Sequence, residues 1–262
     1  MARLRTTINR IAERIEMDRR QATRTVCKYG IPLALLASVI IPVCIPLWAL
    51  IWFAIHQSAK RGGSPIMIAG AAGEEHALTH LTNLPDEYTI FNQICLPDTS
   101  SRTGFREADF AVVGPNGVFL IENKEYRGWI KGNDKSPDWE LHKIGRCDTK
   151  YVKTCRNPVP QVRVYVSLLA GIFRTRGIDA WITPMVSLSS DNYLDGITSE
   201  KVKVLRLVDL CEKILTHQGT LSKENMDKVL ALMEELRANA FKEAHEAEGM
   251  VCFQPEQMES TS

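Results

Sequence analysis

The spacing of apolar residues changes several times along this chain, and each change marks an expected element. One unbroken apolar run covers residues 31–55, helical spacing follows over residues 67–84, and a strand-like run begins at residue 88. Later segments of the same kinds predict strands at 126–132, 138–144, 180–188 and 203–207, and helices from Pro158, over 208–216 and from Ser222. This order predicts an α/β fold with a mixed, mostly antiparallel β-sheet flanked by helices.

The apolar run over residues 31–55 contains no charged residue and exceeds the roughly 20 residues that a bilayer core requires. It predicts one transmembrane helix over residues 30–56, with lipid as its partner. Pro42 and Pro46 lie within the run and would kink such a helix, so a re-entrant hairpin that turns near Pro42 is the alternative. A cleaved signal peptide is not expected, because a long polar segment precedes the run.

Charge and cysteine usage give opposite indications about topology. Residues 1–29 hold eight Lys or Arg against three acidic residues, in a chain whose formal net charge is +1. The positive-inside rule favours a cytoplasmic N-terminus, and a single crossing would then place the rest of the chain outside the cytoplasm. The seven cysteines are scattered and odd in number, unlike a disulfide framework. We expect a single-pass membrane protein whose domain is cytoplasmic.

Residues 106–124 predict a tight β-hairpin. Two apolar-rich runs of strand-forming residues flank a four-residue turn at 114–117, where Gly, Pro, Asn and Gly stand in favoured places. Pairing Val113 with Val118 sets the register of the two strands. Because side chains alternate along a strand, this register predicts which residues share a face.

The register places Asp109 opposite Glu122 and Glu107 opposite Lys124, all on one face. Two facing acids, with Cβ atoms about 4.5 to 5.5 Å apart, need a compensating charge. Mg²⁺ or Mn²⁺ is the natural candidate, because such ions are often held by one or two carboxylates plus water and phosphate. Lys124 could then orient water or neutralise charge on a phosphate. The alternative is an ordinary hairpin with a Glu107–Lys124 surface pair and two solvated acids.

Motifs over a longer span add to the hairpin. They are Gly73-Glu74 in an apolar-periodic helix, Asp109, Ile121-Glu122-Asn123-Lys124, Gly128-Trp129-Ile130, Trp139 and Asn157-Pro158-x-x-Gln161. Over residues 68–176 these motifs resemble the nuclease-related domain (NERD) family, which is grouped with the PD-(D/E)XK, restriction-endonuclease-like nucleases. The resemblance implies that Asp109 and Glu122 bind metal, helped by Glu74, and that Lys124 assists catalysis. Glu74 and Gln161 would be accessory polar residues from flanking helices.

The resemblance also implies a restriction-endonuclease-like mixed sheet flanked by helices. One departure lies beside Asp109, where the family usually has Ile before and His after the aspartate and this chain has Ala108 and Phe110. Strand alternation predicts that both point away from the acids. The departure therefore concerns the packing behind the sheet.

A basic stretch at residues 140–176 is the candidate nucleic-acid interface. It holds eight Lys or Arg against Glu140 and Asp148, and could follow a phosphate backbone, with DNA the expected partner. The alternative is a solvated surface. Gln161 falls on the first turn of the helix that starts at Pro158, where its amide could bond a phosphate or a metal-bound water. The candidate binding residues are Lys143, Arg146, Lys150, Lys153, Arg156 and Arg163.

We expect a membrane-anchored nuclease that hydrolyses phosphodiester bonds of DNA or RNA with Mg²⁺ or Mn²⁺. One alternative is a catalytically silent module that tethers nucleic acid or a protein to the membrane, and another is a structural membrane protein. Besides the transmembrane helix, the expected organisation comprises a basic segment 1–29, a linker 57–66, a NERD-like domain 67–220, a helix 221–244 and a disordered acidic tail 245–262.

Overall fold

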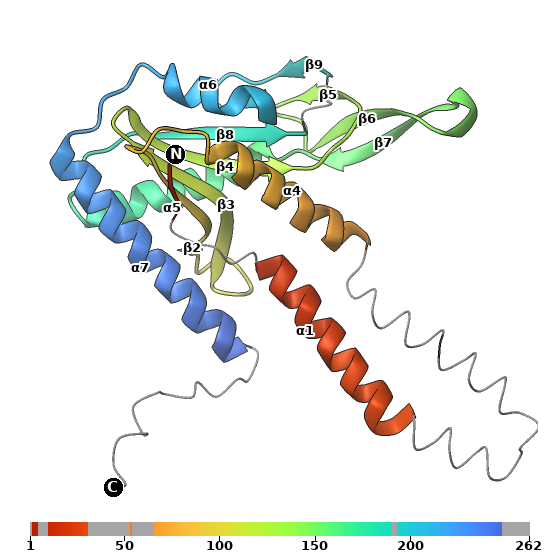
Figure 1. Ribbon diagram of the computed structural model, residues 1–262. Helices are drawn as coiled ribbons and strands as arrows, with labels where there is room; N and C mark the ends of the chain where they lie inside the picture. Colours follow the sequence, from red (N-terminus) through yellow and green to blue (C-terminus); the bar gives the residue numbers. More distant parts are fainter. Residues whose placement is uncertain (1, 5–9, 31–52, 54–64, 190–192, 248–262) are drawn as a thin grey trace, which may run out of the picture. The chain divides into compact units, whose positions relative to one another are not determined.

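A computed structural model describes residues 2–4, 10–30, 53, 65–189 and 193–247 (Figure 1). The chain divides into two compact units, residues 7–76 and the remainder. The first contains α1 (Arg10–Thr25), a π-helical turn (Val26–Gly30) and most of α4 (Pro65–Leu81). None of the helices in the described residues combines the length and apolar character that a membrane span requires. The expected transmembrane run lies outside the described residues, apart from Phe53.

The second unit is built on a six-stranded sheet. Its strands, in spatial order, are β1 (Arg3–Leu4), β2 (Thr89–Pro97), β3 (Phe105–Gly114), β4 (Gly117–Lys124), β8 (Ile182–Leu188) and β10 (Lys203–Arg206). Pairing is antiparallel from β2 to β4 and parallel for β1–β2, β4–β8 and β8–β10. The predicted mixed α/β architecture is confirmed, but the prediction of a mostly antiparallel sheet is wrong, because three of the five strand pairs are parallel.

Helices cover both faces of this sheet (Figure 1). α5 (Val159–Thr175) and α7 (Lys223–Ala247) pack on one face around buried side chains such as Leu120 and Met233. Residues 77–84 and α6 (Leu210–Leu215), which follows a 3-10 turn at Leu207–Asp209, pack on the other. α7 runs three residues into the segment predicted to be disordered; residues 248–262 lie outside the described part.

A second, four-stranded sheet corrects the prediction of a single one. Its order is β7 (Lys150–Arg156), β6 (Asp138–Ile144), β5 (Trp129–Asn133) and β9 (Tyr193–Thr198). The sequence predicted β5 and β6 but missed β7 and β9. Almost every β7 side chain is exposed, so the strand lacks the apolar alternation that would reveal it, and it forms by pairing with β6.

A third apolar cluster joins the two sheets. Trp139 of β6 and Leu141 beside it are buried against Val162 of α5 and against Val186 and Leu188 of β8. Burying each such side chain contributes about 1.5 to 3 kcal/mol. The cluster therefore holds the second sheet firmly beside the C-terminal end of β4.

Candidate functional site

The predicted hairpin register is confirmed. Val113 pairs with Val118, and the ladder continues to Phe110 paired with Ile121. A two-residue turn closes the hairpin, and Gly117 has a φ of +141°, a region that favours glycine. The register of β3 and β4 thus follows from turn chemistry and strand alternation together.

The ladder stops one residue before the expected pair of acids. The backbone N–H of Asn123 donates a 2.7 Å hydrogen bond to Oδ2 of Asp109. In β4, Glu122 pairs with Val186 and Lys124 with Leu188, both on β8. Asp109 therefore satisfies a β4 backbone donor with its own side chain, instead of forming a regular cross-strand pair with Glu122.

The strand on the other side of Asp109 is irregular as well. Gln93 of β2, which stands where the partner of Asp109 would be, has a φ of 54°. Ala108 packs in the cluster beneath α5 and α7, whereas Phe110 packs in the cluster beneath α6. The prediction that both share one face is wrong, because regular alternation breaks at Asp109. Positive φ at a non-glycine residue is strained, and such strain collects at functional sites.

Glu122 and Lys124 form a buried ion pair. Glu122 is fully buried, with both carboxylate oxygens shielded from solvent, and Lys124 Nζ lies 2.5 Å from its Oε1. The side chain of Lys124 is 30% exposed, so the ammonium lies between the buried acid and solvent. The alternative of two solvated acids is wrong for this hairpin.

The charges of this cluster perturb one another. Burial raises the pKa of Asp109, against the opposing effects of Lys124 and of the Asn123 N–H. For Lys124, burial lowers the pKa, but the charges of Glu122 and Asp109 outweigh it and raise the pKa above its usual value. Both carboxylates thus act on the single ammonium of Lys124.

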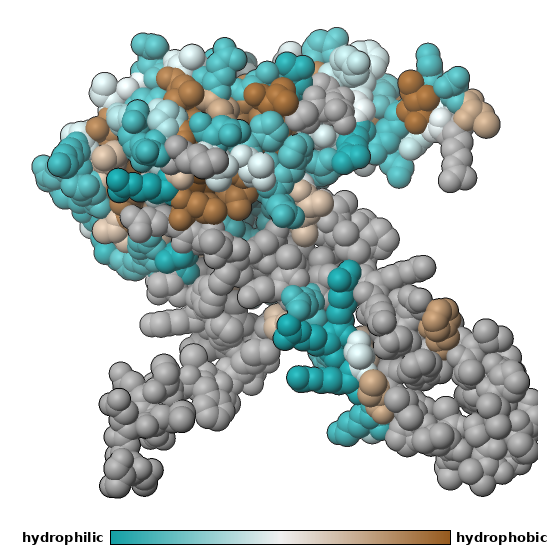
Figure 2. All heavy atoms as spheres, in the orientation of Figure 1, coloured by the Kyte–Doolittle hydropathy of each residue, from teal (hydrophilic) through white to brown (hydrophobic). Residues whose placement is uncertain are grey.

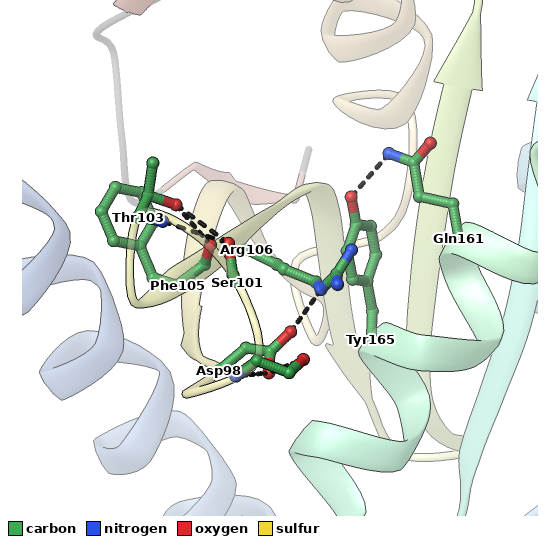
Figure 3. Close-up of polar contacts among 8 residues, drawn as sticks. Asp98, Ser101, Thr103, Phe105, Arg106, Gln161 and Tyr165 are labelled. Atoms are coloured by element: carbon green, nitrogen blue, oxygen red, sulfur yellow. Dashed lines mark hydrogen bonds and ion pairs between the residues drawn. The ribbon is translucent and has the colours of Figure 1, made fainter.

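α5 contributes Gln161 and a residue that the sequence analysis missed, Tyr165. The Gln161 amide donates to the Tyr165 hydroxyl at 2.6 Å (Figure 3). Burial, followed by the charge of Glu122, raises the pKa of Tyr165 to about 12. The two residues are one helical turn apart, and that spacing is the signal that could have identified Tyr165.

Asn157 fixes the start of α5. Its amide nitrogen donates to the carbonyls of Asn133 and Ser136 at 3.1 and 2.7 Å, and its oxygen accepts the N–H of Val159 at 2.9 Å. The side chain is buried, so these bonds are shielded from water. The Asn157-Pro158 motif therefore joins the β5–β6 turn to the helix that carries Gln161.

The loop from β2 to β3 is closed on itself by polar contacts. Asp98 accepts hydrogen bonds from the Ser100 N–H and hydroxyl and forms a 2.5 Å ion pair with Arg106 (Figure 3). The Ser100 hydroxyl and then Arg106 lower the pKa of Asp98 to about 2. These bonds fix the loop immediately before β3.

The remaining predicted residues lie on several elements. Glu74 is half-buried on α4 within the unit of residues 7–76, so its role beside the acids stays a prediction. The side chain of Arg146 lies outside the described part of the chain. The other basic candidates are distributed over three elements, namely β6 (Lys143), β7 (Lys150, Lys153, Arg156) and α5 (Arg163).

No three side chains of His, Cys, Asp or Glu among the described residues gather into a group suited to a metal ion. Asp109 and Glu122 alone nevertheless fit Mg²⁺, which is often bound through one or two carboxylates with water and substrate phosphate completing the shell. A cation between these two carboxylates would favour their ionised forms. Manganese accepts the same oxygen donors.

Comparison with known proteins agrees with this geometry. Residues 69–189 match the family model of the nuclease-related domain. The chain contains a NERD domain, of the general PD-(D/E)XK kind, and the predicted resemblance is confirmed. Asp109, Glu122, Lys124 and Gln161 all fall within the NERD segment.

One relative matches part of the chain. An uncharacterized protein of Bacillus anthracis is 32% identical over 71 residues, which cover 27% of this chain and 32% of that protein. This chain thus spans about a third of the length of the relative. No solved structure matches the chain.

Proposed function

We propose that this protein is a membrane-anchored, metal-dependent nuclease with a restriction-endonuclease-like core, hydrolysing phosphodiester bonds of DNA or RNA. The observation that carries the proposal is the buried cluster at the open end of the β3–β4 hairpin. Asp109, Glu122 and Lys124 come together there, beside the polar side chains of α5. Burying two carboxylates together with an ammonium costs stability, and a purely structural domain has no need of such a cluster.

Each residue has a distinct part in the proposed reaction. Asp109 and Glu122 would hold Mg²⁺ or Mn²⁺, which when bound supplies Lewis acidity for phosphodiester hydrolysis. Because its pKa is raised, Lys124 stays protonated at neutral pH, so it serves as a positive charge towards the phosphate and not as a general base. Its pairing with Glu122 holds the ammonium in place.

Helical residues complete the proposed site. Tyr165 keeps its proton at neutral pH, because its pKa is about 12. Gln161 donates to its oxygen, so the Tyr165 proton can be donated onwards to an acidic or phosphate oxygen.

The test is cleavage by the full-length protein in detergent. Single-stranded and duplex DNA and RNA are incubated with Mg²⁺, with Mn²⁺ or with chelator. We expect metal-dependent cleavage that Asp109→Asn reduces by at least about 100-fold, because the metal contributes several kcal/mol of charge stabilisation. Glu107→Gln, with the same change of charge on the same strand, should cleave normally. Binding without cleavage by the unsubstituted protein would instead identify a silent tether.

We propose that residues 31–55 associate with the membrane, because they form a long apolar run without a charged residue. β1, which precedes this run, pairs with β2, which follows it, through Arg3 with Thr89 and Leu4 with Ile90. Ala2 is buried in the same cluster as Leu81. Segments on both sides of the run thus belong to one folded unit, which favours the re-entrant alternative over a single crossing. We propose that both flanks lie in the cytoplasm.

A further inference from the structure

The β6–β7 hairpin extends beyond the core that holds its base. At the base Trp139 is 1% exposed, whereas Ile144 at the far end is 69% exposed. Figure 1 shows the two strands projecting from the rest of the unit, and in Figure 2 the projecting end carries mainly hydrophilic residues beside a few apolar ones. The far end contributes little to the core, so its exposed side chains are available to a partner.

Strand pairing separates the side chains of this hairpin into two faces. Residues directly opposite in an antiparallel pair share a face, and neighbours along a strand alternate. The inner face contains the two core residues of β6 and the residues in line with them, namely Trp139, Leu141, Lys143, Tyr151, Lys153 and Cys155. The outer face contains Asp138, Glu140, His142, Ile144, Lys150, Val152, Thr154 and Arg156.

The inner face leads to the acidic cluster. Its base packs against Val186 and Leu188, the ladder partners of Glu122 and Lys124. Tyr126, two residues after Lys124, connects the acidic cluster to the hairpin. The Tyr126 hydroxyl donates to a backbone carbonyl of β7 at 3.0 Å.

The electrostatics agree with this placement. Burial raises the pKa of Tyr126, with further effects from Cys155 and from Lys124. Burial and then the charge of Asp138 raise the pKa of Cys155, and the charge of Lys143 opposes them. Cys155 thus lies within electrostatic reach of both Lys143 and Tyr126.

The two faces differ in charge. The inner face has two lysines, Lys143 and Lys153, and no acid. Tyr151 stands opposite Lys143 and is 40% exposed, which offers a ring for a base to stack on. The outer face mixes Asp138 and Glu140 with its basic residues, so it has far less attraction for a polyanion.

We propose that the inner face of the β6–β7 hairpin binds the sugar-phosphate backbone of a nucleic-acid strand that continues to Asp109 and Glu122. This assignment rests on the proposed nuclease function in treating that strand as substrate. Of the six basic candidates, Lys143 and Lys153 would contact the strand. Lys150 and Arg156 would not, because they lie on the outer face. At about 3.3 Å per residue, the line from Cys155 to Tyr151 spans about 13 Å of strand.

The test compares two double variants of equal charge in the full-length protein. Lys143→Ala/Lys153→Ala removes the inner lysines, and Lys131→Ala/Lys150→Ala removes two from the outer face, where Lys131 is opposite Glu140. Both carry Asp109→Asn, and binding of fluorescein-labelled single-stranded and duplex DNA is followed by anisotropy in chelator. Replacing the inner pair should raise Kd about tenfold and reduce the slope of log affinity against log salt concentration by about 1.5. Replacing the outer pair should change both quantities much less. Tyr151→Leu should weaken single-strand binding more than duplex binding.

Equal effects of the two pairs, or no effect of the inner pair, would overturn the assignment. Cleavage by the same double variants without Asp109→Asn separates this result from the proposed function. If the inner pair binds normally while metal-dependent cleavage persists, the nuclease stands and the inner face is not its strand path. If the inner pair loses binding and the unsubstituted protein never cleaves, the inner face is confirmed and the domain is a silent binder.

Discussion

Asp109 both accepts a backbone hydrogen bond and is a proposed metal ligand. Its side chain accepts the backbone N–H of Asn123 on the neighbouring strand β4. The neighbouring β2 strand accommodates it with a positive φ at Gln93. Sequence patterns could identify the acid but not this distortion, because it arises only when three strands are brought together.

A stability cost follows from the raised pKa of Asp109. A carboxyl whose folded pKa exceeds its unfolded value favours folding only when protonated, so metal-free protein gains stability from this group as pH falls through that pKa. At neutral pH the ionised group is unfavourable, and Asp109→Asn should unfold at an equal or higher temperature than the original protein in chelator.

The same substitution should abolish stabilisation by metal. Saturating Mg²⁺ at about 100 times Kd would stabilise the original protein by about 2.7 kcal/mol, because ligand binds only the folded state. Thermal scans with and without Mg²⁺ at pH 5 and 7 check this, with Glu107→Gln as the control. A variant that is much less stable in chelator would show that Asp109 is primarily structural.

Tyr165 gives a second prediction at this scale. Tyr165→Phe removes a buried hydroxyl near Glu122, and hydrogen bonds to charged groups contribute about 1.5 to 3 kcal/mol. Cleavage should slow by about 10- to 100-fold, with stability changed by no more than about 1 kcal/mol. Tyr126→Phe is the matched control, because its hydroxyl bonds a backbone carbonyl. Equal losses in the two variants would remove the special role of Tyr165.

At the scale of elements, α5 positions the site and Asn157 positions α5. Three hydrogen bonds link this side chain to the β5–β6 turn and to the first turn of the helix. The sequence predicted a helix starting at Pro158, and α5 begins at Val159. It could not predict that Asn133 and Ser136 accept hydrogen bonds from Asn157, because these two residues lie more than twenty positions away.

Asn157→Ala should therefore destabilise the fold by about 2 to 4 kcal/mol, since it leaves buried backbone groups unpaired. It should also slow cleavage at temperatures where the protein remains folded, because Gln161 and Tyr165 lose their fixed helix. Urea denaturation gives the first quantity and initial rates give the second. Asn133→Ala, which removes an exposed asparagine from the same turn, should cost about 1 kcal/mol or less. Normal rates in folded Asn157→Ala would mean that α5 is held by its apolar face alone.

At the scale of the whole molecule, the pairing of β1 with β2 decides the proposed topology. The exposed Cys27 precedes the apolar run, and the exposed Cys147 follows it. We expect a membrane-impermeant maleimide to label both from the cytoplasmic side in inverted vesicles and neither in intact cells. Variants that retain one of these cysteines, with the other six replaced by Ser, separate the two signals. Labelling from opposite sides would establish a single crossing.

The sequence alone determined the features that depend on near neighbours. Turn residues and alternation predicted the register of Val113 with Val118, and helical spacing predicted α5. It also identified Asp109, Glu122 and Lys124, because two strands joined by a tight turn bring their residues together wherever the rest of the chain folds.

Only the tertiary structure decided what depends on distant partners. The second sheet, the irregularity at Gln93 and the placement of Tyr165 near Glu122 each need segments far apart in sequence. An exposed strand such as β7 has no apolar pattern of its own, since its hydrogen bonds come from a partner strand. Local periodicity records which side chains a segment buries, whereas long-range pairing is chosen by the free energy of the whole fold.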